Sequence, residues 1–478
     1  MRILLASSEV YPYSKTGGLG DAVGALGKAL ALAGHEVVIV TPLHRGVREK
    51  FAGLRRVDWK FDLPLGAKRV DAALLALEVS TGLTVYFVDK PEYFDRPGIY
   101  NDSGGDYGDN AERFIFFSKC VVHLARHLPL KPEVLHVHDW PVALVPMLFQ
   151  QEHRAGGWAK PPRSCLTIHN LAYQGVFPRA AFNLTNLPAS CFHPETVEFY
   201  GQLNCLKAGI ACADAVTTVS PRYAREITTQ EFGAGLDGLL RKRQHALTGI
   251  LNGVDYEEWN TATNPLIAAP FSADNIGGKT ICKAALQRRF DLAQDARIPV
   301  FGSVTRLADQ KGIDITVGAL EEMLAASMQF VLLGSGSANY EQALKALAQR
   351  HPGKVGLQLG YDHALAHQIE AGCNFFLMPS RFEPCGLNQL YSLRYGTVPI
   401  VRRTGGLDDT VIDATDDSAR ANGIKFLEPA PHALAKSMRK ALLLFQDQAL
   451  LGRYQANGMA ENFSWAKAVN EYEVIYLG

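Results

Sequence analysis

The 478-residue sequence lacks long apolar runs, Cys-x-x-Cys pairs and an excess of either charge. No run reaches the roughly 20 apolar residues of a membrane helix, and the short run in MRILLASSEV indicates a buried first strand and not a signal peptide. The eight cysteines are dispersed, which is typical of reduced thiols. Lys+Arg and Asp+Glu are equal at 48 each. We therefore expect a cytoplasmic protein that binds neither nucleic acid nor membranes.

Two nucleotide-binding motifs are incomplete. Gly277–Thr280 resembles the end of a phosphate-binding P-loop, but the upstream position of that motif is Ala273 instead of glycine. The run Gly17–Gly20 resembles a dinucleotide fingerprint, but its third glycine comes one place late, at Gly24. The next strand ends in Thr41-Pro42, without an acidic residue for a ribose diol. These departures argue against an ATPase and a redox dinucleotide enzyme.

A third motif, His136-Val137-His138-Asp139, has two interpretations. It is either a metal cluster or the end of a strand that flanks a site. Alternation along a strand places His136 and His138 on one face and Asp139 on the other. Because no second pair of ligands is evident, we favour the strand interpretation and expect no metal.

The length suits two domains, and the pattern of elements predicts parallel α/β sheets. The first strand, Arg2–Ala6, precedes a loop at 7–20, a helix that Asp21 caps and that ends near Gly34, and a strand at Glu36–Val40. Continuously apolar strands of this kind are covered by helices on both faces. Further strands are expected at 134–138, 165–168, 215–219, 300–304, 330–333, 375–378 and 398–401.

The two halves show the same architecture used twice. Asn, Gly, Asp and Pro cluster without periodicity between Asn252 and Asn264, which marks a boundary. We expect one domain at 1–255, a second at 256–458, and a last helix at 459–478. The apolar residues of that helix (Trp465, Val469, Tyr472 and Tyr476) share one face.

Polar residues follow the strands of the first half. Lys15 lies with Thr16, Gly17 and Gly18 in the first loop, where glycines let backbone amides approach an anion. Asp139 follows the strand at 134–138, and His169 follows the strand at 165–168. Ligands of parallel sheets bind beyond the carboxyl ends of the strands, although His169 could equally be a buried structural residue.

In the second half, Arg306 and Lys311 flank the loop after the strand at 300–304, and two cations there can reach one diphosphate. A helix is predicted to start near Gly386 and to end at Gly396, so its free amides form an anion site. Glu383 lies just before that start and can accept hydrogen bonds from sugar hydroxyls. Cys385 has no base placed beside it, which favours packing over a nucleophilic role.

These residues, in this order, resemble the bacterial glycogen synthase and plant starch synthase family. The resemblance covers essentially the whole chain, and its most specific motifs are Lys-Thr-Gly-Gly-Leu and Glu-Pro-Cys-Gly-Leu. The matching stretches are Lys15–Leu19, Asp109–Phe114, His138–Trp140, Thr167–Gly175, Thr217–Pro221, Ile250–Asp255, Arg306–Leu307, Gln310–Gly312, Pro379–Leu387 and Arg403–Leu407. The resemblance implies the GT-B fold, in which two Rossmann-like doubly wound domains face each other across a cleft.

The resemblance also implies an activity: transfer of glucose from ADP-glucose to an α-1,4-glucan such as glycogen, with retention of configuration and without a cofactor. Residue roles follow from position in the family's motifs. Arg306 and Lys311 would neutralise the ADP leaving group, with the backbone of Cys385, Gly386, Leu387 and Asn388 at its distal phosphate. Glu383, Asp139, His169 and Asn252 would surround the glucose, Tyr361 would stack on the adenine, and Lys15, Thr16, Gly17 and Gly18 would face the donor.

Two alternatives remain at this point. One keeps the donor and changes the acceptor to a small sugar or sugar phosphate, and the other is a non-catalytic carbohydrate-binding relative. Intact Lys15, Arg306, Lys311 and Glu383 argue against the second. The chain departs from the family pattern at Gly20, Pro141 and Asn388. We expect Gly20 to affect only the flexibility of its loop.

Overall fold

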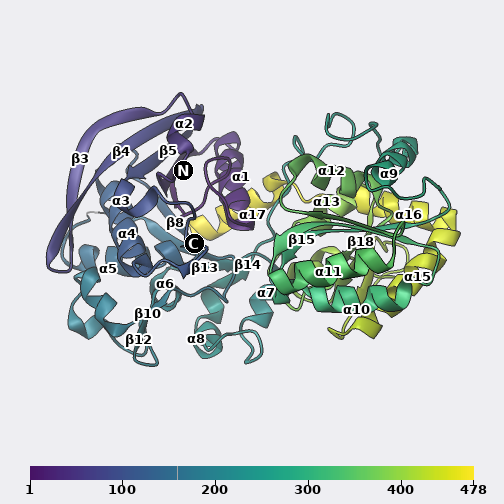
Figure 1. Cartoon of the computed structure of the whole chain (residues 1–478). Coiled ribbons are helices and arrows are strands. Elements are labelled where there is room, and N and C mark those ends of the chain that lie inside the picture. The colour runs from purple at the N-terminus through teal and green to yellow at the C-terminus, as the bar shows by residue number, and fades with distance from the viewer. Residues whose placement is uncertain (159) are drawn as a thin grey trace. The chain divides into compact units, whose positions relative to one another are not determined.

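The computed structural model describes residues 1–158 and 160–478 and divides into two compact units (Figure 1). The first unit comprises Met1–Gly253 together with Trp465–Gly478, and the second comprises Val254–Ser464. The last helix, α17 (Trp465–Leu477), thus belongs to the first unit although it follows the second in sequence. Each unit is built on a mainly parallel β-sheet with helices on both faces.

The sheet of the first unit has the strand order β14-β13-β9-β8-β1-β2-β5-β4-β3. It is parallel from β14 to β5, and β4 and β3 add to one edge as an antiparallel ribbon. Its strands are β1 (Arg2–Ala6), β2 (Glu36–Pro42), β3 (Arg55–Leu65), β4 (Lys68–Ser80), β5 (Leu83–Asp89), β8 (Val134–His138), β9 (Arg163–Ile168), β13 (Ala215–Thr218) and β14 (Leu247–Gly249). β1 pairs with both β2 and β8, so the strand order reverses beside it. That reversal is where ligands of such sheets bind.

Successive residues of the central strands are buried on opposite faces of this sheet. Leu4 and Val38 pack with helices α4 (Asn110–His127), α5 (Val145–Arg154) and α6 (Cys205–Cys212). Ile3 and Val37 pack on the other face with α1 (Gly18–Leu32) and α17. Burial on both sides accounts for the continuously apolar sequence of β1 and β2.

The sheet of the second unit is parallel throughout the described strands, in the order β17-β16-β15-β18-β19-β20. Its strands are β15 (Val300–Leu307), β16 (Gln329–Gly336), β17 (Val355–Leu359), β18 (Phe375–Met378), β19 (Val398–Arg402) and β20 (Ile424–Phe426). Numbered from β15, this is the 3-2-1-4-5-6 order of the Rossmann fold, with the reversal between β15 and β18.

Helices cover both faces of the second sheet as well. Phe301 and Phe330 pack with α10 (Ile313–Met323), α11 (Ala338–Arg350) and α15 (Pro431–Gln446). Val300 and Val331 pack on the opposite face with α9 (Gly277–Arg289) and α12 (His363–Gly372). The other α-helices of this unit are α13 (Asn388–Arg394), α14 (Gly405–Thr410) and α16 (Gln448–Ala460). The predicted α/β class with two doubly wound parallel sheets is therefore confirmed.

Three local predictions were wrong. Asp21 does not cap the first helix, because α1 begins at Gly18 with Gly17 as its N-cap, so Asp21 lies in the first turn. β15 continues through Arg306 to Leu307, since its ladder with β16 extends to the pair Leu307–Gly336. The expected loops after Val304 and Leu333 therefore start a few residues later.

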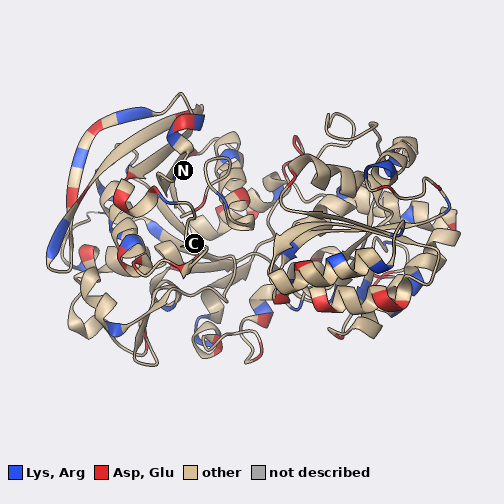
Figure 2. Ribbon diagram, in the orientation of Figure 1, with Lys and Arg blue, Asp and Glu red and all other residues tan. Residues whose placement is uncertain are grey.

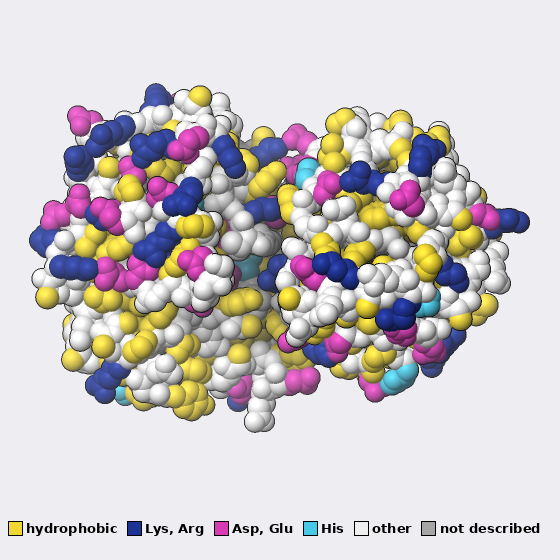
Figure 3. All heavy atoms as spheres, viewed as in Figure 1, with side chains coloured by type: hydrophobic (Ala, Val, Ile, Leu, Met, Phe, Trp, Pro, Cys, Tyr) yellow, Lys and Arg dark blue, Asp and Glu magenta, His cyan; other side chains and the backbone are white. Residues whose placement is uncertain are grey.

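Charged residues of both signs are distributed over each unit (Figure 2), as expected from the balanced composition. Lys and Arg are interspersed with Asp and Glu on both units (Figure 2), and both signs occur on the face drawn in Figure 3. Within the described part of the chain, each of the eight cysteines is a free thiol. Among the same residues, no helix combines the length and the apolar character that a membrane-spanning segment requires.

Because residues of α17 are part of the core of the first unit, we expect their removal to lower the free energy of unfolding. Tyr472 is 2% exposed in the core shared with α1, so Tyr472→Ala should destabilise the protein by about 3 kcal/mol. Val474 lies on the same helix but is 69% exposed, and Val474→Ala should change stability by less than about 0.5 kcal/mol. Urea unfolding curves of the two variants test this. Equal midpoints would mean that α17 does not contribute to the core.

Candidate functional site

In the first unit, the loop after β1 is held by a carboxylate that the sequence analysis did not single out. Glu9 is 3% exposed. It accepts hydrogen bonds from the backbone N of Thr16 (2.5 Å) and Gly17 (3.3 Å) and from the Thr16 hydroxyl (2.8 Å). The hydroxyl of Tyr100 donates to it as well, at 2.7 Å. Glu9 therefore fixes the segment on which Lys15 stands.

Lys15 is also oriented by a side chain of α1. Its Nζ lies 2.9 Å from Asp21 Oδ1 and 3.1 Å from Oδ2, and 4.9 Å from the centre of the Tyr11 ring. A Cβ on Gly20 would come within 2.8 Å of Lys15 Cβ and 2.9 Å of the Ser14 carbonyl oxygen. The expectation that Gly20 affects only flexibility was wrong, because glycine is what lets this loop lie against the start of α1.

Asp139 follows β8 in a strained conformation. Its φ of 60° and ψ of −179° lie in a region that residues other than glycine rarely adopt. Its Oδ1 accepts hydrogen bonds from the backbone N of His169 (2.7 Å) and Asn170 (3.4 Å). Burial raises the pKa of Asp139 to about 7; the amides of His169 and Asn170 oppose that rise, and the charge of Glu9 adds to it. The strain aims a buried, weakly acidic carboxyl group at the end of β9.

The histidines of β8 are part of a buried hydrogen-bond network. His136 contacts the Tyr476 hydroxyl through Nδ1 (2.8 Å) and the Thr167 hydroxyl through Nε2 (2.6 Å). His138 Nδ1 lies 3.1 Å from His169 Nε2. Burial lowers the pKa of His136 and His169 to about 3, so both rings are neutral at pH 7. The contacts of His136 and His138 support the interpretation as strand residues beside a site, and His169 is partly buried next to Asp139.

In the second unit, an ion pair joins the carboxyl ends of β15 and β18. Lys311 Nζ lies 2.6 Å from Glu383 Oε2, and the two side chains are 18% and 8% exposed. The Ser380 hydroxyl donates to the same oxygen at 2.9 Å. Gly312, with φ of 66°, lets the turn approach β18 closely, because a Cβ there would lie 2.3 Å from the Pro379 carbonyl oxygen. The cation and the carboxylate that the sequence predicts at this edge are therefore in direct contact.

The segment Glu383–Asn388 packs backbone to backbone on the start of α14. A Cβ on Gly405 would lie 1.9 Å from the Glu383 carbonyl oxygen, and one on Gly406 would lie 2.0 Å from that of Cys385. Glycine is needed at both positions. Cys385 itself is buried at 5% exposure, and Gly386 has φ of 72°.

The helix after this segment starts at Asn388, two residues later than predicted, with Leu387 as its N-cap. The Asn388 side chain donates to the Val304 carbonyl oxygen at 2.5 Å and so ties the helix start to β15. The first amides of a helix lack partners within it. These amides thus stand near the end of the strand that carries Arg306.

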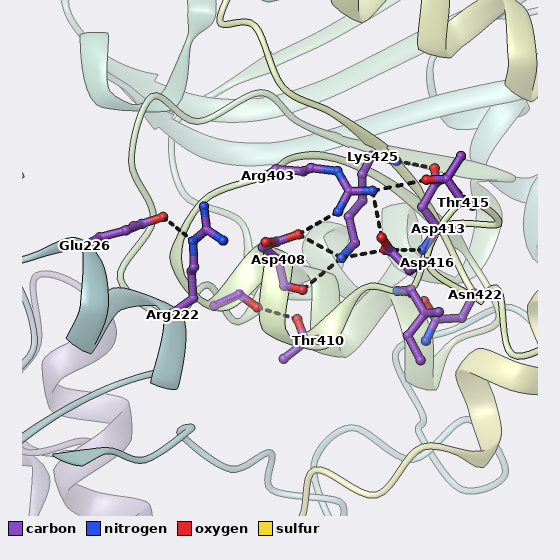
Figure 4. Close-up of polar contacts among 12 residues, drawn as sticks. Arg222, Glu226, Arg403, Asp408, Thr410, Asp413, Thr415, Asp416, Asn422 and Lys425 are labelled. Carbon is purple, nitrogen blue, oxygen red and sulfur yellow. Dashed lines mark hydrogen bonds and ion pairs between the residues drawn. The ribbon is translucent and has the colours of Figure 1, made fainter.

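An ionic network connects Asp408 of α14 to two cations and a second aspartate (Figure 4). Asp408 accepts from Arg403 at 3.2 Å and from Lys425 at 2.8 Å, and Asp416 pairs with the same two cations at 2.8 and 3.0 Å. Within α14, the Thr410 hydroxyl donates to the Gly406 carbonyl oxygen at 2.6 Å. This network holds the two glycines against the Glu383 segment.

The remaining predicted residues also lie at or just after the carboxyl ends of strands. Arg306 is exposed near the end of β15, and Tyr361 is 77% exposed two residues after β17. Asn252 is 6% exposed, three residues after β14. The predicted residues of each unit therefore lie at the carboxyl ends of its own sheet. Glu9 and Ser380 were missed because an acidic residue or a serine beside a strand carries no distinctive spacing.

Comparison with known proteins identifies both units. Residues 2–242 match the family model described as "Starch synthase catalytic domain", and residues 287–457 match "Glycosyl transferases group 1". The chain is 50% identical over 478 residues to a glycogen synthase of Anaeromyxobacter dehalogenans, covering 100% of this chain and 98% of the relative. It is 44% identical over 479 residues to a glycogen synthase of Opitutus terrae, covering 100% and 99%.

Solved structures show the same likeness. The catalytic domain of starch synthase IV from Arabidopsis thaliana, solved with ADP and acarbose, has a TM-score of 0.90 and 33% identity, covering 99% of this chain and 98% of that one. A sucrose-phosphate synthase from Thermosynechococcus elongatus, at 18% identity and a TM-score of 0.62, shares the fold. The chain belongs to the glycogen synthase and starch synthase family and is a glycosyltransferase with the GT-B fold.

Proposed function

We propose that the enzyme transfers glucose from ADP-glucose to the non-reducing end of an α-1,4-glucan in the cytoplasm, with retention of configuration. The observation that carries this proposal is the group Arg306, Lys311 and Glu383 at the strand-order reversal of the second sheet. Two cations and one buried carboxylate suit a substrate that has a diphosphate joined to a polyhydroxylated sugar. Membership of the family supports the same substrates.

The cations are assigned to the leaving group. Arg306 is exposed and can turn toward a diphosphate, whereas Lys311 is already oriented by Glu383. The backbone of Cys385, Gly386, Leu387 and Asn388 contributes amide dipoles beside them. Stabilising the negative charge that grows on ADP as the sugar bond breaks is the largest catalytic contribution in this assignment.

Four groups are assigned to the glucose: Glu383, Asp139, His169 and Asn252. Neutral His169 can donate or accept one hydrogen bond. Tyr361, exposed after β17, is assigned to the adenine face, and Lys15, Thr16, Gly17 and Gly18 to the donor from the first unit. No carboxylate is assigned as a nucleophile. The acceptor hydroxyl attacks from the side that ADP leaves, and the departing phosphate takes its proton.

We propose further that the transfer needs no divalent metal, because lysine, arginine and helix amides meet the phosphate charge. The test is release of ADP from ADP-glucose with glycogen as acceptor, in the presence of EDTA. Activity with glycogen and none with glucose or glucose phosphates supports the proposal. Activity only with a small acceptor, or loss on chelation with rescue by magnesium, would reject it.

Arg306 gives the clearest single-residue test of the donor assignment, because its side chain is exposed. Arg306→Ala should lower kcat by about 10²-fold or more and leave the unfolding midpoint unchanged. Arg350→Ala is a matched control, since Arg350 is an exposed arginine of the same unit that pairs with Glu321. Near-normal turnover of the Arg306 variant would show that this side chain points to solvent.

Asp139 makes the folding stability depend on pH. Its folded pKa of about 7 lies above the value of 3.8 expected in the unfolded chain, so the folded state binds the proton more tightly. This contribution is fully present below about pH 4 and is lost as the pH rises through 7. Between pH 4 and 8, wild type should therefore lose a few kcal/mol relative to Asp139→Asn, measured by urea unfolding. Parallel stability curves for the two proteins would mean that the carboxyl group is not buried as described.

A further inference from the structure

A cluster of potential ligands in the second unit consists of residues that have no assigned role in the reaction. His363 and His367 are four residues apart on α12 and so share one face of the helix. Glu258, from the segment after β14, reaches the same face, with its Oε1 3.5 Å from His363 Nε2 and 4.0 Å from His367 Nε2. One ligand atom from each of the three residues lies within 4.8 Å of the others.

His367 is the buried member and is rigidly held. Its side chain is 0% exposed, and its ring stacks on Trp259 with the centres 3.9 Å apart and an interplanar angle of 24°. Trp259 stacks in turn on Tyr391. Among the described residues, His367 Nε2 is buried without a hydrogen-bond partner, yet it faces Glu258. An unpaired buried nitrogen is costly, and a bound cation would satisfy it.

The other nitrogen of His367 has the partners that a metal ligand needs. When Nε2 binds a metal, the ring proton is on Nδ1, which lies 3.1 Å from the Tyr395 hydroxyl oxygen, an acceptor. Asn264 Nδ2, 2.9 Å from Nδ1, has two hydrogens, and it can direct them to Tyr395 (2.8 Å) and to the Glu258 carbonyl oxygen (3.4 Å). The surroundings of the ring therefore accommodate a metal-bound tautomer.

We propose that Glu258, His363 and His367 bind one divalent transition-metal ion, with Zn²⁺ as the preferred ion. Two imidazoles and a carboxylate are a known zinc ligand set, and two histidines spaced by four on a helix suit it. Zinc–ligand bonds of about 2.0 Å place tetrahedral ligand atoms roughly 3.3 Å apart. The 3.5 Å separation of Glu258 and His363 is close to this, and the partly exposed side chains of both residues can close the remaining gap to His367.

The ion would join the segment that opens the second unit to the first turn of α12. Glu258 lies four residues after Val254, where this unit begins, and His363 is the first residue of α12. The site thus has a structural role that differs from the metal-independent transfer proposed above. Its test measures metal affinity and thermal stability, so it does not depend on the outcome of the transfer assay.

The experiment uses the full-length protein after dialysis against a chelator. Zn²⁺ is titrated in competition with a chromophoric chelator, and Co²⁺ serves as a spectroscopic probe of coordination. We expect one equivalent of Zn²⁺ to bind and to raise the melting temperature. His363→Ala and Glu258→Gln should each weaken binding by at least about 10-fold and reduce that rise, and Tyr395→Phe should weaken it by about 10-fold through loss of the Nδ1 partner. His363 is 45% exposed, so its removal leaves the fold in place.

His432→Ala is the matched control. His432 is another exposed histidine of the same unit that pairs with a glutamate, Glu428, at 3.1 Å, but it belongs to no group of three potential ligands among the described residues. Its removal should leave zinc affinity unchanged. Absence of stoichiometric zinc binding to wild type, or equal affinity in wild type, His363→Ala and Glu258→Gln, would overturn the proposal.

Discussion

Lys311 and Glu383 form a mostly buried ion pair that links the two strands between which the second sheet reverses its order. The position of each side chain depends on the other, because removing one partner leaves the other without its counter-charge. Gly312 allows the turn that carries Lys311 to approach β18, while Gly405 and Gly406 allow the Glu383 segment to lie on α14. The network of Arg403, Lys425 and two aspartates then holds α14 in place.

In the first unit, the loops at the strand ends are positioned by hydrogen bonds to buried carboxyl groups instead of by an ion pair. Glu9 is a buried carboxylate that is used for positioning, since it accepts hydrogen bonds from the backbone of the loop that carries Lys15. Asp139 is placed by backbone strain, and its hydrogen bonds to two successive amides offset part of the cost of burial. In both units, a strand sets the start of a loop, and a buried acidic residue (Glu9 in the first unit, Glu383 in the second) contacts the loop and sets its conformation.

Much of this arrangement was predictable from the sequence. Apolar strands followed by glycine-rich loops predicted both parallel sheets, and strands β1, β8 and β18 have the predicted bounds. Lys15, Asp139, His169, Arg306 and Lys311 were predicted at strand ends from the same pattern, whereas Asn252 and Tyr361 came from the family resemblance. Direct contact between Lys311 and Glu383 was not, because 72 residues separate them and their pairing depends on how two loops fold back. Glu9 was missed because tertiary packing, and not spacing, brings its partners together. The two histidines of the Glu258–His363–His367 cluster do have helical spacing, but only tertiary packing brings Glu258 beside them.

We propose that Glu383 binds the sugar and orients Lys311, whereas Lys311 and Arg306 bind the phosphates. Parallel measurement of kcat and of the dissociation constant for ADP in Glu383→Gln tests this most directly. The account predicts a fall in kcat of about 10²-fold or more, with ADP affinity unchanged or tighter because Lys311 is released from its partner. A loss of ADP affinity as large as the loss of kcat would contradict it, since Glu383 would then belong to the phosphate site.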